Sequence, residues 1–282
     1  MRQDRVREAV FLLPGTAWLL LFFALPLVII LVVSFGTRDQ YGGVLFNPLT
    51  LRAYERALEP DFLPTVLNSL RYAGLTTIFS IAISYPVAYW ISRNGGRRKL
   101  LLLVLVMLPF WTSWVIRTYA WMMILGDTGV LNGALQGVGL SDEPIVILNT
   151  DFAVVLGMTY GFLPFAILPL YVSIDRLDPE LVAAARDLYA DGRSAFLHVT
   201  LPLTMPGIIA AALLTFIPSI GDFVTPDLLG GAQTITVAKV IQLLFMSSRD
   251  WPFGAALSFL LMVATIAGTL ATLRILRREV IG

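Results

Sequence analysis

The sequence predicts an all-α membrane protein with six transmembrane helices. Three observations predict it: 57% of the 282 residues are hydrophobic, only 14% are charged, and the mean hydropathy is +0.79. Soluble chains carry about 25% charged residues. The deficit is concentrated in long apolar stretches, which indicates membrane spans rather than a uniformly apolar surface.

A helix needs about 20 apolar residues to cross the hydrocarbon core. Uninterrupted runs such as residues 19–33 lack the period-two alternation of barrel strands, so the spans are expected to be helices. We expect one transmembrane domain over residues 1–282, with a charged loop at 173–202. The six predicted spans are residues 11–35, 66–91, 99–125, 151–172, 203–228 and 252–276.

The distribution of Lys and Arg predicts the topology. The two termini and the loops after the second and fourth spans, together with the adjoining span ends, hold 13 of these cations, whereas the other three loops with their span ends hold 6. Because cytoplasmic loops carry the excess of cations, both termini are expected to face the cytoplasm. An even number of spans agrees with this.

Composition also excludes most enzyme chemistry. The chain has no Cys and one His, His198, which leaves no thiolate nucleophile, disulfide framework or His-rich metal site. Neither Lys99 nor Lys239 lies in a phosphate-binding G-x-x-x-x-G-K-[ST] loop. We therefore expect no catalytic residue, metal or cofactor in this chain, and ATP with Mg²⁺ would have to be bound by a partner.

The charged loop contains a recognisable motif. Permease subunits of type I ABC importers carry a cytoplasmic motif of Glu-Ala-Ala, three residues, Gly, nine residues, an aliphatic residue, any residue and Leu-Pro. Ala184, Ala185, Val199, Leu201 and Pro202 have that spacing, and the chain resembles this family. The resemblance implies a six-helix type I permease fold and a loop that docks on an ATPase subunit. The implied coupling residues are Ala183, Ala184, Ala185, Arg186, Asp187, Leu188, Tyr189 and Gly192.

Two positions depart from the motif. Its Glu falls on Ala183 and its Gly falls on Tyr189, while Glu180 lies one helical turn upstream and Gly192 three residues downstream. The motif Glu is expected to contact the ATPase. A sister permease with an intact loop would then carry more of the coupling.

Further strings are similar to the spermidine/putrescine branch of this family. They are Leu108-Pro-Phe-Trp-Thr112, Ile116-Arg-Thr-Tyr119, residues 202–209 and residues 249–256. The resemblance implies inward polyamine transport by alternating access in a bacterial inner membrane. It also implies a second permease subunit, two ATPase subunits and an extracytoplasmic substrate-binding protein as partners.

Asp222 is the main candidate for the substrate path. It lies between Pro218 and Pro226, where a broken helix would expose backbone to a cavity. A carboxylate at such depth is unfavourable unless it has a function or a partner. Two interpretations stay open: Asp222 attracts a protonated amine, or it forms a structural ion pair with Arg117, which is otherwise a candidate gate residue.

The remaining path candidates are aromatic residues and a second carboxylate. For each aromatic residue, the alternative is a place in the core or in an interfacial belt. Asp227 would attract the polycation near the outer mouth or simply cap a loop. These candidates are Trp111, Trp114, Tyr160, Phe216 and Asp227.

Other functions remain as alternatives. The same machine could carry an opine, thiamine or ferric ion. An ion-coupled secondary transporter would need carboxylates in several spans, and the spans hold almost none apart from Asp222. An intramembrane enzyme is disfavoured by the missing Cys and the single His.

Overall fold

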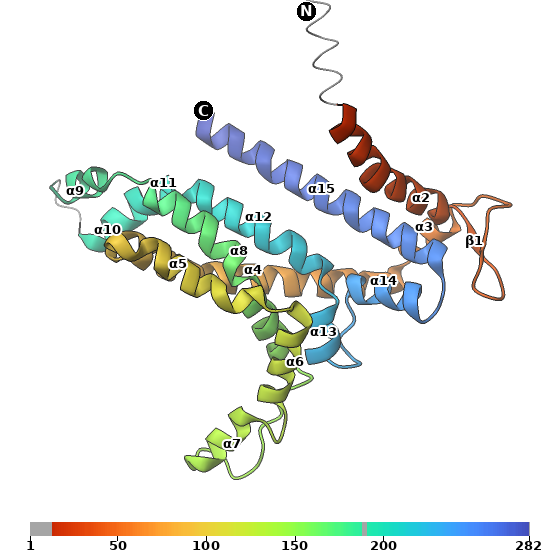
Figure 1. Cartoon of the computed structure of the whole chain (residues 1–282), viewed down its shortest axis with the longest axis horizontal. Coiled ribbons are helices and arrows are strands. Elements are labelled where there is room, and N and C mark those ends of the chain that lie inside the picture. The colour runs from red at the N-terminus through yellow and green to blue at the C-terminus, as the bar shows by residue number, and fades with distance from the viewer. Residues whose placement is uncertain (1–12, 188–190, 282) are drawn as a thin grey trace, which may run out of the picture. The chain divides into compact units, whose positions relative to one another are not determined.

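The computed structural model describes residues 13–187 and 191–281, which are mostly helical (Figure 1). Contacts within the chain group it into two units, residues 1–63 with 240–282 and residues 64–239. Each unit is described by itself. The single domain that the sequence predicts stays a prediction.

The first unit is built on two long helices. The first runs from Leu13 to Ser34, with a π-helical turn at Leu20–Ala24 that continues as α2 (Leu25–Ser34). It packs beside α15 (Trp251–Ile281), as Figure 1 shows. Between them in sequence lie a short antiparallel hairpin, β1 (Thr37–Arg38) and β2 (Val44–Leu45), and the helix α3 (Arg52–Ala57).

Helix α3 is fixed to the start of α15 by one arginine. Arg56 Nη1 lies 3.0 Å from Asp250 Oδ2, and its guanidinium carbon lies 4.1 Å from the centroid of the Phe253 ring. Asp250 is buried, so the ion pair neutralises a carboxylate that would otherwise be unfavourable there.

The second unit holds the other helices. Helices α8 and α12 run side by side, and α6 and α7 lead away from them (Figure 1). Helix α14 begins in this unit and continues into the first. The elements are α4 (Leu63–Asn94), α5 (Lys99–Met107), α6 (Trp114–Leu125), α7 (Val130–Gly137), α8 (Asp151–Asp175), α9 (Pro179–Asp187), α10 (Gly192–Ala195), α11 (Leu201–Leu203), α12 (Met205–Gly221), α13 (Val224–Leu229) and α14 (Val237–Met246).

Four of the described helices are long and apolar enough to cross a membrane, and two bent helix pairs bring the count to as many as six. The four are Leu13–Ser34, Pro60–Asn94, Asp151–Asp175 and Trp251–Thr272. The bent pairs are Gly96–Trp111 with Trp114–Gly137, at 83°, and Gly192–Leu203 with Met205–Gly221, at 62°.

The predicted spans 99–125 and 203–228 are therefore not continuous helices. In the first, Thr112 and Ser113 are extended and the helix restarts at Trp114, downstream of Pro109, which has no amide hydrogen to donate. The second is interrupted twice: the 62° bend lies at Thr204, between α11 and α12, and α12 ends at Gly221 because Asp222 is extended. The second break lies between Pro218 and Pro226, where the sequence indicated one.

Helix α4 packs on α8 through a row of small side chains. Thr76, Ser80, Ser84 and Ala88 recur every four residues and are fully buried. Ser80 and Ser84 each donate a 3.4 Å hydrogen bond to a backbone carbonyl of α8. Small residues and interhelical hydrogen bonds of this kind let membrane helices approach closely.

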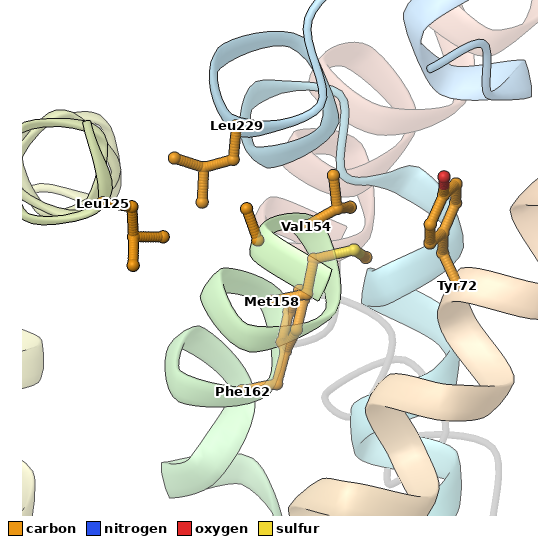
Figure 2. Close-up of a cluster of buried hydrophobic side chains, with 7 residues drawn as sticks. Tyr72, Leu125, Val154, Met158, Phe162 and Leu229 are labelled. Atoms are coloured by element: carbon orange, nitrogen blue, oxygen red, sulfur yellow. The ribbon is translucent and has the colours of Figure 1, made fainter. Parts of the chain in front are cut away.

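A hydrophobic cluster joins α8 to its neighbours. Figure 2 shows side chains from α4, α6 and α13 gathered around α8, whose Val154, Met158 and Phe162 supply the centre. Tyr72, Leu125 and Leu229 complete the labelled set. This cluster holds the short helices α6 and α13 against a long one, and both short helices carry residues of the site described next.

Candidate functional site

Asp222 lies in the break between α12 and α13, and its two carboxylate oxygens have different environments. Oδ1 accepts hydrogen bonds from the backbone N–H groups of Val224 (3.0 Å) and Thr225 (3.2 Å), so it caps the first turn of α13. Oδ2 is buried and has no hydrogen-bond partner. One oxygen therefore fixes the side chain, while the other is buried with its hydrogen-bonding capacity unused.

Arg117 is held by aromatic rings rather than by a carboxylate. Its guanidinium carbon lies 5.0 Å from the centroid of Phe110 and 5.2 Å from that of Trp114. Both contacts are within the range of a cation–π interaction. The Nε and Nη1 atoms are nevertheless buried without a hydrogen-bond partner.

Arg117 and Asp222 line the same cavity, which has a volume of about 630 Å³. They are the charged members of its lining, which is otherwise mainly apolar and aromatic. Ligand cavities typically measure about 300–1,000 Å³ and combine apolar walls with a few polar groups. The lining residues are Met107, Phe110, Trp111, Trp114, Arg117, Gly161, Phe162, Pro164, Phe165, Leu168, Pro218, Gly221, Asp222, Phe223 and Val224.

Two glycines of α8 make the short helices fit against it. A Cβ atom on Gly161 would lie 2.4 Å from the Trp114 ring, and one on Gly157 would lie 2.4 Å from the Leu229 side chain. Only a residue without a side chain allows such close approach. These glycines therefore set the positions of Trp114, in the cavity wall, and of α13, which Asp222 caps.

The predicted path residues divide into two groups. Trp111, Trp114 and Asp222 line the cavity, but Tyr160, Phe216 and Asp227 do not. The Tyr160 ring packs behind the wall, 5.2 Å from Phe110 and 5.4 Å from Trp121 between centroids. Phe216 is half-buried on α12.

Asp227 has a partner that the sequence did not indicate. Its Oδ1 lies 3.1 Å from Nζ of Lys239, which is buried and also donates a 2.8 Å hydrogen bond to the Gly231 carbonyl. Asp227 thus neutralises a buried lysine, a role different from both predicted ones.

The ion pair of Arg117 with Asp222, one of the two interpretations left open by the sequence, is not formed in the described conformation. Both residues lie in the described part of the chain, and no contact of 4.0 Å or less joins their charged atoms there. The sequence also missed several aromatic walls. Phe162 and Phe165 flank Pro164 on α8, and Phe223 follows Asp222 directly, so proximity to the prolines was the available signal.

The predicted coupling loop follows the C-terminal end of α8, beyond the residues of α8 that line the cavity. Ala183, Ala184, Ala185, Arg186 and Asp187 belong to α9, where Ala185 is half-buried and the other four are exposed. Gly192 begins α10, which Asp191 caps through a 2.7 Å hydrogen bond from Ser194 N–H. Leu188 and Tyr189 lie outside the described residues.

The junction of α8 with this loop is pinned by polar contacts. Asp175 Oδ1 lies 2.6 Å from Lys99 Nζ and accepts a 3.0 Å hydrogen bond from Ser92 Oγ. Arg93 Nη2 donates to the Leu177 carbonyl at 3.4 Å. These bonds tie the end of α8 to α4 and to the start of α5. We call the region around Asp175, together with α9, the coupling end.

Comparison with known proteins identifies the family. Residues 9–279 match the model of the binding-protein-dependent transport system inner membrane component. The chain belongs to this family.

Relatives and solved structures agree with that membership. The chain is 46% identical over 247 residues to the spermidine/putrescine transport system permease protein PotB of Haemophilus influenzae, which covers 88% of this chain and 86% of the relative. It is 42% identical to PotB of Escherichia coli, over 87% of this chain and 89% of the relative. A bacterial ABC transporter involved in alginate import shares the fold, with a TM-score of 0.75, 20% identity and coverage of 98% and 96%.

This permease is accordingly a multi-pass inner membrane protein with the type I ABC importer fold, and it is not an enzyme. ATP hydrolysis belongs to a separate subunit. Within residues 13–187 and 191–281, no three His, Cys, Asp or Glu side chains gather as a metal site would require.

Proposed function

We propose that this ABC importer permease moves polyamines, such as spermidine and putrescine, inward through the cavity lined by Asp222. The observation that carries the proposal is a buried carboxylate oxygen without a partner in a cavity with aromatic walls. The names of the relatives, at 46% and 42% identity, support the same substrate class.

The chemistry of the cavity suits a protonated amine. An ammonium group has several N–H donors, and Asp222 Oδ2 is a charged acceptor with no competing bond. The face of Trp111 offers a cation–π contact of about 0.5–2 kcal/mol, whereas the Trp114 ring already carries Arg117. Low polarity in the surroundings strengthens attraction between the two charges.

Transport would proceed by alternating access. ATP binding and hydrolysis in two partner ATPase subunits, which hold ATP and Mg²⁺, would switch the permease between two conformations with different affinity for the amine. We expect α9 to enter a groove on one ATPase subunit, because its small Ala184 and Ala185 allow close approach while Arg186 and Asp187 can pair across the contact.

A second permease subunit and an extracytoplasmic binding protein would complete the complex. A solved alginate transporter with the same fold, at a TM-score of 0.74, is described in complex with a periplasmic protein that carries an alginate pentasaccharide. The excess of Lys and Arg in one set of loops supports a topology with both termini in the cytoplasm. A reporter fused after Gly282 should then be active only as a cytoplasmic probe.

The test is uptake by the complete transporter in proteoliposomes. The complex should accumulate labelled putrescine and spermidine when its binding protein and ATP are supplied, and each polyamine should compete with the other. Uptake that ignores both polyamines would contradict the substrate class while leaving the family membership intact.

An opine is the second candidate, because the cavity contains an unpaired cation as well as an unpaired anion. A solute with both an amine and a carboxylate could bind Asp222 and Arg117 together. The same assay separates the two candidates. Opine uptake that is lost in Arg117→Gln and unaffected by excess putrescine would favour the opine.

A further inference from the structure

Arg117 and Asp222 are opposite charges that line one cavity without forming an ion pair. Each has buried atoms, Nε and Nη1 of the arginine and Oδ2 of the aspartate, that lack a hydrogen-bond partner. An unpaired buried charge is strongly unfavourable, and pairing relieves it. The described conformation thus leaves a favourable interaction between these two residues unmade.

The aromatic rings hold Arg117 only in part. A guanidinium group is weakly hydrated and stacks well on ring faces, as it does here on Phe110 and Trp114. Ring faces do not satisfy its N–H groups, however, and a desolvated carboxylate would attract it more strongly. The rings are therefore a position that Arg117 can occupy and can also leave.

Both residues lie next to breaks in the helices. Arg117 is on the first turn of α6, after the extended residues Thr112 and Ser113, and Asp222 is itself the extended residue between α12 and α13. Helices α6 and α13 touch each other, and both rest on glycines of α8. Chain breaks of this kind absorb the backbone changes of a conformational transition. A modest shift of either short helix would change the separation of the two charges.

We propose that Arg117 is a tethered competitor of the substrate's ammonium group for Asp222. In the described conformation Arg117 rests on the rings and Asp222 Oδ2 is buried without a partner, so an amine that reaches it meets no competing cation. In the alternate conformation of the transport cycle, Arg117 pairs with Asp222 and displaces the amine. This inference rests on the proposed polyamine function, since the displaced group is a cation.

This exchange between the amine and Arg117 would give the binding site a different affinity for the amine in each conformation, as alternating access requires. A transporter must bind its substrate in one conformation and lose affinity for it in the other. An internal cation that arrives only in the second conformation lowers affinity there without weakening the first. In the alternate conformation, Arg117 would neutralise the carboxylate after the amine has left.

The transport test uses four forms of the complete transporter in proteoliposomes: wild type, Arg117→Gln, Asp222→Asn and the double variant. With putrescine as the substrate, Arg117→Gln should lower the maximal rate about tenfold and lower the KM, because release is slowed while binding is kept. In the Asp222→Asn background the same change should alter the rate less than about twofold, because Arg117 acts through Asp222. Arg117→Lys keeps the charge and should restore part of the rate.

Other kinetic outcomes would overturn the proposal. If Arg117→Gln slows transport equally with and without Asp222, or raises the KM, Arg117 does not compete with the amine. If the double variant instead recovers the thermal midpoint and the rate that Asp222→Asn loses, the two residues form a static ion pair. The midpoint of the purified complex is measured for each form to detect such a structural role.

A cross-linking test does not depend on the substrate. The chain has no cysteine, so Arg117→Cys with Asp222→Cys creates one defined pair of thiols. A short bifunctional thiol reagent is applied to the complete complex without nucleotide and after trapping with ATP and vanadate. Cleavage at a protease site inserted near the exposed Val138 and Leu140 then separates the two halves unless they are cross-linked.

The yield should differ at least about fivefold between the two nucleotide states, as expected when one conformation brings the residues together. A control pair, Arg117→Cys with Asp142→Cys, should stay uncross-linked in both. Equal yields in both states, or none in either, would refute the exchange. If the wild-type complex ignores putrescine while the double-cysteine variant shows the state-dependent cross-link, the polyamine function alone would be refuted.

Discussion

Asp222 and Asp175 are carboxylates of the same structural unit with opposite environments. Asp175, at the coupling end, is bound by Lys99 at 2.6 Å and by Ser92 at 3.0 Å. Asp222, in the cavity, is capped on one oxygen and unpartnered on the other. In this permease, the carboxylate that joins helices has bonding partners, whereas the carboxylate that faces the cavity keeps one oxygen without a partner.

The same contrast extends to the neighbouring surfaces. The coupling end exposes small and charged residues of α9, which suits contact with another protein subunit. The cavity is walled mainly by aromatic rings, of which Trp114 packs closely on Gly161, and such walls suit a small cation. Substitutions at the two regions should therefore fail in different ways.

The largest effect is expected at the coupling end. Replacing Ala185 with Trp puts a bulky ring on the half-buried side of α9 and should abolish ATPase association, because close helix packing is lost. Uptake should fall to the background of vesicles without ATPase, and co-purification of the ATPase should fail. Ala271→Trp, on an exposed position of α15, serves as the control. Normal uptake in Ala185→Trp would exclude α9 as the coupling element.

Asp222→Asn should have the next largest effect. It keeps the shape of the side chain and removes the charge, so polyamine uptake should fall at least about tenfold, equivalent to roughly 1.4 kcal/mol. Expression and ATPase association should be preserved. Asp142→Asn, in an exposed loop, is the matched control. Wild-type uptake in Asp222→Asn would eliminate its role in the substrate path.

Gly161→Ala should disturb the cavity through packing alone, because it changes no charge. The added methyl group would lie 2.4 Å from the Trp114 ring and force the cavity wall to move. Overpacking of this kind costs about 1–3 kcal/mol, so the thermal midpoint should fall and uptake should drop several-fold. Gly74→Ala, where a Cβ meets nothing within 4 Å, should leave both measurements unchanged.

The smallest effect is expected for Asp175→Asn. The side chains of Asp175 and Lys99 are about one-third exposed, at 32% and 33%, so solvent screens their attraction. Pairs of this kind contribute about 0.2–1 kcal/mol. Uptake should stay within about twofold of wild type. A loss as large as that of Asp222→Asn would contradict the distinction between the paired and unpaired carboxylates.

Much of the fold was predictable from local sequence. Long apolar runs identified the spans, since length and hydropathy alone decide whether a helix can cross the membrane. The spacing of Ala184, Ala185 and Leu201-Pro202 indicated the permease family, which the family match confirms. The extended Asp222 was foreseeable from Pro218 and Pro226. The break within residues 99–125 was not predicted, because hydropathy does not register a two-residue interruption at Thr112 and Ser113.

The composition of the cavity was less predictable. Trp111, Trp114 and Asp222 were identified, whereas Tyr160 packs behind Phe110 and Asp227 binds Lys239. Nothing in the local sequence distinguishes an aromatic residue that lines a cavity from one that packs in the core of the same span. A partner twelve residues away, such as Lys239 for Asp227, is likewise invisible to local patterns.

The sequence by itself determined how many segments can enter the membrane, the break between Pro218 and Pro226, and which residues bear charge inside the spans. Those properties follow from hydrophobicity, from the missing amide hydrogen of proline and from the cost of burying an ion. Only the tertiary structure decided that Arg117 rests on two rings and not on Asp222. That outcome depends on how closely Gly157 and Gly161 let α13 and α6 approach α8, and such approach distances are set by packing between segments distant in the sequence.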